Sequence, residues 1–145
     1  MKKNQKTATD IYNYMESALR DVKDATKNII RKKKYGVTVD QWLVLRKISG
    51  ADEINQSGIA AATSKDPAAI TRMIDLMVQK GLVQRKSSKT DKRASLIKLT
   101  RKGKGLVQRM SPVVDKLYSQ SLHDISDRDL NAVRRVSNRI AENLG

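Results

Sequence analysis

The sequence predicts a mainly α-helical protein that contains one small β-hairpin. Apolar residues recur at helical spacing over most of the chain, from Ile11 to Leu144. Between residues 82 and 99 the pattern changes to two short extended segments. The pair Asp66-Pro67 marks a helix start shortly before that change, because proline at the first helical position needs no hydrogen-bond donor. The predicted order is one helix, a three-helix cluster, a hairpin and two further helices.

The composition indicates one folding unit with a lean core, since the chain has 145 residues of which 39% are hydrophobic. A core this thin gains stability when the chain buries surface against a second copy of itself. The chain holds 30 Lys and Arg against 15 Asp and Glu, a net charge of +15. This charge favours a polyanionic partner, nucleic acid first and an anionic membrane surface second.

Several classes of protein are excluded. The sequence has no cysteine and only one histidine, His123, which rules out disulfides, thiolate ligands and histidine-rich metal sites. No pair of carboxylates and no Ser, His and Asp set suggests catalysis, so we expect neither an enzyme nor a cofactor. No apolar run could span a membrane, and none follows the basic N-terminus as in a secretion signal. We therefore expect a cytoplasmic, nucleoid-associated protein.

The first helix is predicted from about Ile11 to the basic run at residues 31–34, whose cations suit the carboxyl end of the helix dipole. Its apolar residues alternate in steps of four and three, as in a helix that packs lengthwise on another helix. They are Ile11, Met15, Ala18, Val22, Ala25 and Ile29.

Two helices come next. Thr38 and Gln41 form a capping box that opens a helix ending at Gly50. This helix is expected to bury Trp42, Leu45 and Ile48. A short helix follows over residues 56–62, with Ile59 as its main core residue.

The helix that begins at Pro67 has two different faces. Asp66 is its predicted N-cap and Gly81 its stop. The buried face is expected to hold Ile70, Met73, Ile74, Met77 and Val78. The outward face, whose small side chains would let the helix enter the major groove of DNA, carries Ala68, Ala69, Thr71, Arg72 and Asp75.

The segments 82–86 and 94–99 are expected to pair as a hairpin. The linker between them lacks the Asn-Gly or Gly-Gly pair of a tight turn, so we expect a long, basic, projecting loop. Its basic residues, suited to a narrow minor groove, are Lys89, Lys92 and Arg93. The window from Lys80 to Lys104 holds ten basic residues and a single acidic one, Asp91. Such a window indicates an interaction patch rather than a merely solvated face.

Two helices close the chain. Thr100 is the predicted N-cap of the first, Gly103 weakens its first turn, and Pro112 should kink it. Ser126 caps the second. Their apolar positions are Leu106, Val107, Met110, Val113, Val114 and Leu117, then Leu130, Val133, Val136, Ile140 and Leu144. Because these faces are too apolar to stand alone, we expect them to pair with another chain.

Helices followed at once by a basic hairpin make a winged helix-turn-helix. We expect residues 35–100 to form this DNA-binding lobe, and residues 1–34 and 101–145 to form flanking dimerisation helices intertwined with it in one domain. A two-fold dimer would present its two groove-reading helices about one DNA turn apart, roughly 34–36 Å.

Five stretches of the chain carry a family resemblance. They are Val37 to Leu45, Ala68 to Ile74, Lys80 to Val83, Asp91 to Arg93 and Leu99 to Gly103. The most specific pieces are Thr-Arg on the groove-reading helix, the Gly-Leu-Val turn and the Asp-x-Arg wing. In this order and spacing, from about residue 8 to its end, the chain resembles the MarR family of bacterial transcription regulators.

The resemblance implies an obligate homodimer that binds a palindromic operator in double-stranded DNA, usually as a repressor. It implies groove reading by residues 67–72 and a wing from which Arg93 enters the minor groove. The residues expected to bind DNA are Ser64, Lys65, Pro67, Ala68, Ala69, Thr71, Arg72, Lys86, Lys89, Asp91, Lys92 and Arg93. Because Ala68 and Ala69 replace hydroxyl-bearing residues often found there, we expect a base specificity different from that of relatives.

Such proteins are commonly released from DNA by a small, often phenolic or anionic, ligand bound between the dimer helices and the DNA-binding lobe. The candidate pocket residues are Tyr12, Trp42, Met110 and Val114. A lone Trp on the inner face of a helix, however, more often belongs to the core. The missing cysteines exclude the peroxide-sensing branch, and the single histidine argues against the zinc-sensing branch.

Two other functions compete with a ligand-responsive regulator. The same basic surface could serve an architectural protein that coats DNA without reading its sequence. A protein of the membrane surface is disfavoured, because the basic window lies on a hairpin rather than on an amphipathic helix with bulky apolar anchors.

Overall fold

The computed structural model describes residues 2–51, 53–87 and 95–145. It contains six helices and three strands in this part of the chain. In order they are α1 (Lys2–Lys33), α2 (Val39–Ser49), β1 (Ile54–Asn55), α3 (Gln56–Thr63), α4 (Pro67–Gln79), β2 (Val83–Ser87), β3 (Ser95–Leu99), α5 (Arg101–Ser121) and α6 (Asp127–Leu144). The predicted mainly helical fold with a small hairpin is confirmed.

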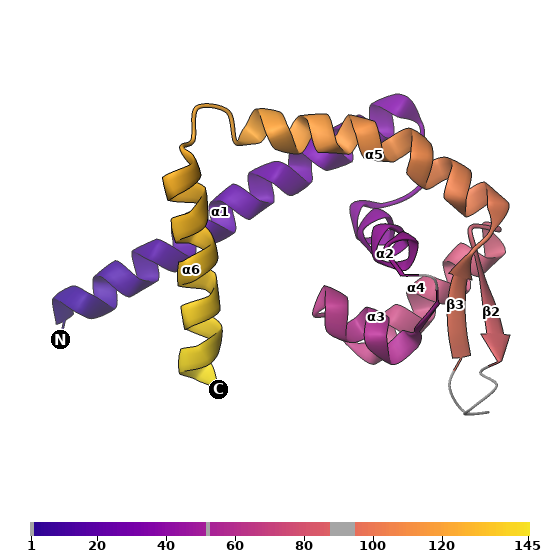
Figure 1. Cartoon of the computed structure of the whole chain (residues 1–145), viewed down its shortest axis with the longest axis horizontal. Coiled ribbons are helices and arrows are strands. Elements are labelled where there is room, and N and C mark those ends of the chain that lie inside the picture. Colours follow the sequence, from indigo (N-terminus) through magenta and orange to yellow (C-terminus); the bar gives the residue numbers. More distant parts are fainter. Residues whose placement is uncertain (1, 52, 88–94) are drawn as a thin grey trace.

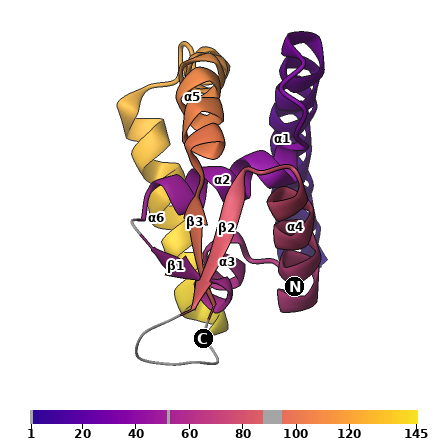
Figure 2. The same cartoon turned by 90° about the vertical axis from the view of Figure 1, so that its right-hand side faces the viewer.

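The molecule has a lobe and two projecting helices. In Figure 1 the helices α2, α3 and α4 and the sheet gather at one side beneath α5, while the N-terminal part of α1 and all of α6 extend away from them. The views from two sides show that α1 and α6 overlap only in projection, since Figure 2 places them on opposite sides of the molecule.

The sheet is antiparallel, with strand order β1-β3-β2. The hairpin pairs Val83 with Leu99 and Ser87 with Ser95 at its two ends. The strand β1, whose Ile54 lies opposite Ile97, adds a third strand that the sequence analysis did not predict. Two residues are too short a segment to show the alternation by which a strand is predicted from sequence.

Three helix starts confirm predictions made from the sequence. The Thr38 side chain accepts a hydrogen bond from the Gln41 backbone N–H at 3.1 Å, and the Gln41 side chain accepts one from the Thr38 N–H, which completes the capping box. Thr100 caps α5 through the Gly103 N–H at 3.0 Å. Ser126 caps α6 through a backbone N–H at 3.1 Å. Asp66 is the N-cap of α4 but makes no side-chain capping bond.

The end of α4 is a Schellman motif. Gly81 has a φ of +73°, a conformation that glycine adopts without steric cost. The Leu82 N–H donates to the Met77 carbonyl and the Gly81 N–H to the Val78 carbonyl, both at 2.9 Å. The predicted stop at Gly81 is therefore confirmed, and it turns the chain directly into the wing.

The core lies in the lobe and under α5. Its fully buried side chains include Trp42, Val44, Leu45, Ile59, Ile70, Ile74, Met77, Ile97, Met110 and Val114. One expectation for α4 was wrong: Val78 is 38% exposed. Met73 is only partly buried against the core. The buried stripe of α4, which packs against α3 and β2, is therefore narrower than its sequence pattern and consists of Ile70, Ile74 and Met77.

Gly103 was expected only to weaken the first turn of α5, but the structure gives it a further role. A Cβ atom at this position would collide with the backbone carbonyl oxygen of Leu82, so only glycine lets α5 begin this close to the chain entering β2. The helix then continues through Pro112 to Ser121. Among the residues that the structure describes, none of the helices combines the length and apolar character needed to cross a membrane.

The projecting helices leave apolar side chains uncovered. No residue of α6 is buried, and Val133, Val136 and Leu144 are exposed. On α1, which begins at Lys2 rather than near Ile11, the exposed apolar residues are Ile11, Tyr12, Tyr14, Met15 and Leu19. Of the seam predicted for the first helix, only Val22, Ala25 and Ile29, in the C-terminal part of α1, are half-buried. Their neighbour Ile30 is buried in the core.

Candidate nucleic-acid interface

The N-terminal half of α4 presents small side chains and one cation. Pro67, Ala68, Thr71 and Arg72 are exposed, and Ala69 is half-buried. Arg72 makes no hydrogen bond or ion pair with any other residue that the structure describes. Its guanidinium is therefore available to an acceptor outside the protein, such as a base edge or a phosphate.

Thr71 lies in a different setting from Arg72, although the two are adjacent. Its hydroxyl donates to the Pro67 carbonyl at 3.1 Å and accepts from the Gln56 side-chain amide at 3.1 Å. The Gln56 carbonyl oxygen in turn accepts from Arg85 Nε at 3.0 Å, and the Arg85 guanidinium pairs with Asp75 at 2.6 Å. These four side chains, Thr71, Gln56, Arg85 and Asp75, are called the α4–wing network below.

The remaining described residues predicted to bind DNA have partners inside the protein or lie in turns. Ser64 is the C-cap of α3 and adopts the left-handed conformation, with φ at 53°. The Lys65 ammonium lies 3.2 Å from the Asp40 carboxylate, and that of Lys86 lies 3.4 Å from Glu53. Four further predicted residues, Lys89, Asp91, Lys92 and Arg93, lie outside the described residues.

The four candidate pocket residues are not brought together around a cavity. Trp42, Met110 and Val114 have no exposed surface and belong to the core. Tyr12 is 52% exposed on the projecting part of α1. The interpretation of Trp42 as a core residue therefore agrees with its position, whereas the four residues do not form the pocket that we expected.

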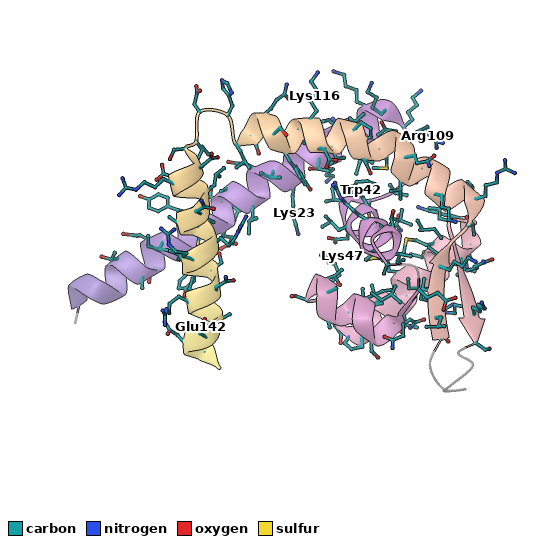
Figure 3. All side chains as sticks on the ribbon, viewed as in Figure 1. Lys23, Trp42, Lys47, Arg109, Lys116 and Glu142 are labelled. Atoms are coloured by element: carbon teal, nitrogen blue, oxygen red, sulfur yellow. The ribbon has the colours of Figure 1, made fainter. Side chains whose placement is uncertain are left out.

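A different cavity lies between α1, α2 and α3. This groove, called the α1–α2 groove, has a volume of about 780 Å³ and is open to solvent. Its charged lining residues are Lys23, Asp40, Arg46, Lys47 and Lys65. Figure 3 shows Lys23 pointing from α1 toward the lobe, on the side where Lys47 lies. Lys23 and Lys47 form no ion pair within the part of the chain that the structure describes.

Arg46 lines this groove and also contacts Trp42 of the core. Its guanidinium pairs with Asp115 of α5 at 2.6 Å and lies 5.7 Å from the centre of the Trp42 ring, within cation–π range. Two buried donors here, Arg46 Nη1 and Trp42 Nε1, have no acceptor among the residues described. A buried N–H without an acceptor is costly, so these two donors reduce the stability of this region.

Sequence analysis missed several residues of these sites. Gln56 and the cations of the groove, Lys23 and Lys47, carry no local signal, because their roles depend on elements that meet only in the folded chain. Arg85 was part of the basic window but was not among the expected DNA-binding residues. Across residues 2–51, 53–87 and 95–145, no group of His, Cys, Asp and Glu side chains gathers closely enough to hold a metal ion.

The arrangement of α3, α4 and the three-stranded sheet defines a winged helix-turn-helix protein (Figure 1). Residues 37–95 match the model of the MarR family. The predicted family resemblance is confirmed.

Three solved structures show that the likeness extends over the whole fold. A MarR family transcriptional regulator from Rhodococcus sp. RHA1 is 27% identical over 92% of this chain and 94% of its own, with a TM-score of 0.78. A mutant MarR from E. coli complexed with operator DNA is 22% identical over 90% and 93%, with a TM-score of 0.80. BpsR of Bordetella bronchiseptica, whose DNA binding is regulated by 6-hydroxynicotinic acid, is 18% identical over 91% and 98%, with a TM-score of 0.78.

Proposed function

We propose that this chain is a sequence-specific DNA-binding transcription regulator that acts as a homodimer on a palindromic operator. The observation that carries the proposal is the exposed first half of α4, where small residues surround Arg72, whose guanidinium makes no hydrogen bond or ion pair with another described residue. A helix of this shape can enter the major groove, where Arg binds guanine through two hydrogen bonds. The MarR mutant from E. coli, which shares this fold, is complexed with operator DNA and so supports a DNA-binding function here. The proposal assigns no catalytic step to the chain and places it on the nucleoid, in the cytoplasm.

The uncovered helices support the homodimer. The apolar residues of α6 and those of the N-terminal part of α1 form two separate faces, on opposite sides of the molecule, that a single chain leaves in water. Exposed apolar faces of this kind mark interaction sites. We assign residues 1–34 and 101–145 to the dimer interface and residues 35–100 to the DNA-binding lobe. Two-fold symmetry would then place two copies of α4 about 34–36 Å apart, one for each half of a palindrome.

A small anionic ligand bound in the α1–α2 groove would release the protein from DNA, as expected of a repressor. The volume of about 780 Å³ suits a small molecule. Lys23 and Lys47 offer charge that is not neutralised by a described carboxylate. The groove lies between α1 and the lobe, where a ligand could shift one against the other. The regulation of BpsR by an aromatic acid supports this assignment.

A nonspecific DNA-coating protein is the second function that the net charge of +15 favours. The two functions differ in how binding responds to salt, because phosphate contacts weaken as salt rises whereas base contacts persist.

The deciding experiment is a selection of genomic DNA fragments by the purified dimer at about 0.15 M salt, where nonspecific binding is suppressed. We expect an enriched inverted repeat that outcompetes random DNA by at least about a thousandfold. Binding without an enriched motif would instead favour the DNA-coating protein.

A further inference from the structure

The α4–wing network joins three elements of the DNA-binding lobe through side chains that are only partly buried. Gln56 is the first residue of α3, Arg85 lies in β2, and Thr71 and Asp75 lie one turn apart on the same side of α4. The links run from Thr71 to Gln56 at 3.1 Å, from Gln56 to Arg85 at 3.0 Å and from Arg85 to Asp75 at 2.6 Å. The network thus connects the groove-reading helix to the strand that leads into the wing.

The network changes what Thr71 can offer to DNA. Its hydroxyl hydrogen is directed to the Pro67 carbonyl, and its oxygen accepts from Gln56. The hydroxyl therefore has no hydrogen to donate to an outside partner and keeps one lone pair, beside a methyl group that suits the methyl of thymine. Donation of hydrogen bonds to base acceptors by the first half of α4 consequently falls to Arg72.

The network also occupies Arg85. Its Nε donates to Gln56, its terminal nitrogen pairs with Asp75, and only 32% of the side chain is exposed. A phosphate contact would need a cation that is free to face the backbone of DNA. Arg85 belongs to the basic window, yet its charge is already matched by a carboxylate on α4.

We propose that Gln56, Asp75 and Arg85 are positioning residues, which set the orientation of α4 against the wing and thereby the sequence discrimination of the protein. This inference rests on the proposed function. A partly exposed ion pair adds little to folding stability. Recognition of a base requires more precise positioning than folding does, because a base-contacting side chain such as Arg72 must be held within about 0.5 Å of its productive position. The network should therefore affect specificity far more than stability.

The test compares Arg85→Lys and Arg85→Ala with the wild-type dimer. Fluorescence anisotropy would give the affinity for the selected operator and for random DNA over a series of salt concentrations. Lysine keeps the charge but cannot donate in two fixed directions. We expect both variants to lower the ratio of operator to random affinity by about tenfold or more. The slope of log K against log salt should stay unchanged, because no phosphate contact is lost.

The opposite pattern would overturn the inference. If Arg85 binds a phosphate, Arg85→Ala lowers both affinities equally and reduces the salt slope by about one, while Arg85→Lys behaves like the wild type. A wild-type protein that shows no operator preference would refute the proposed function itself, and with it this inference. Preference in the wild type that survives in both variants would refute the positioning role alone.

Two further variants sharpen the result. Asp75→Asn removes a negative charge near the DNA, so binding to random DNA should strengthen while operator preference falls. A loss of affinity for both DNAs would count against the network. Gln84→Ala is the matched control, since Gln84 is the preceding residue of β2, is exposed and makes no side-chain hydrogen bond with another described residue. It should leave the operator-to-random ratio intact. Unfolding curves with unchanged midpoints would confirm that each variant folds.

Discussion

Thr71 and Arg72 are neighbours on α4, but their side chains differ in whether they form hydrogen bonds within the protein. The hydroxyl of Thr71 makes two hydrogen bonds within the protein, whereas the guanidinium of Arg72 makes no hydrogen bond or ion pair with another described residue. Both were predicted to bind DNA from their place on the outward face of the helix. The sequence could not distinguish them, because Gln56 lies 15 residues away along the chain. Of the two, only Arg72 combines exposure with polar hydrogens that are not donated to another described residue.

Substitution of Arg72 by alanine tests its assignment as a base reader. We expect Arg72→Ala to weaken operator binding by roughly 1–3 kcal/mol and to blur the preference at one base pair in each half-site. Binding measurements on a set of operators with single base changes would show this. An equal loss on operator and random DNA would reduce Arg72 to a phosphate contact.

Gly103 and Gly105 make a matched pair for a stability measurement. A methyl group at position 103 meets the carbonyl oxygen of Leu82, while at position 105 its nearest neighbour is the flexible end of Arg109 at 3.4 Å. Gly103→Ala should therefore destabilise the fold by roughly 1–3 kcal/mol through overpacking. Gly105→Ala should stabilise it by roughly 0.5–1 kcal/mol, because alanine favours the helix. Urea unfolding at one fixed protein concentration measures both, and two shifts of the same sign would contradict the assigned contacts.

At the scale of the element, the sequence predicts those features that depend on residues close together in the chain. The capping box of α2, the Thr100 and Ser126 caps and the stop at Gly81 depend on residues a few positions apart, and all are confirmed. The strand β1, the α1–α2 groove and the α4–wing network depend on contacts between distant segments. The exposure of Val78 was mispredicted for the same reason, since a helical repeat shows the apolar stripe but not how widely its neighbours cover it.

The apolar face of α6 gives a prediction about assembly. Val136→Asp places a charge in the proposed interface and should shift the protein from dimer to monomer, as measured by analytical ultracentrifugation. Asn138→Asp makes the same charge change on the other side of the helix and should leave the dimer intact. A dimer that tolerates Val136→Asp would remove α6 from the interface.

At the scale of the whole molecule, the α1–α2 groove and α4 should be linked thermodynamically. If a ligand in the groove lowers operator affinity by some factor, the operator must lower the ligand's affinity by the same factor. Calorimetric titration of the free dimer and of the dimer–operator complex with aromatic carboxylates, 6-hydroxynicotinate included, would reveal it. We expect a factor of about 5–150.

The groove also provides a variant and its control. Lys47→Glu should abolish ligand binding while the protein still folds, because it reverses a charge that lines the groove. Lys116→Glu reverses a charge on α5, away from the groove, where Figure 3 shows the side chain pointing outward, and should leave ligand binding unchanged. Equal effects of the two substitutions would show a general influence of net charge rather than a site.

The surfaces proposed to join two protomers, on α1 and α6, lie apart from the surface proposed to read DNA, on α4 (Figure 1). A gene encoding Arg72→Ala would therefore yield chains that still assemble with wild-type subunits. In a cell that expresses both alleles, mixed dimers would hold one half-site and lose the other. The damaged allele would then be genetically dominant, and a second mutation that disrupts α6 in the same chain would restore the wild-type phenotype.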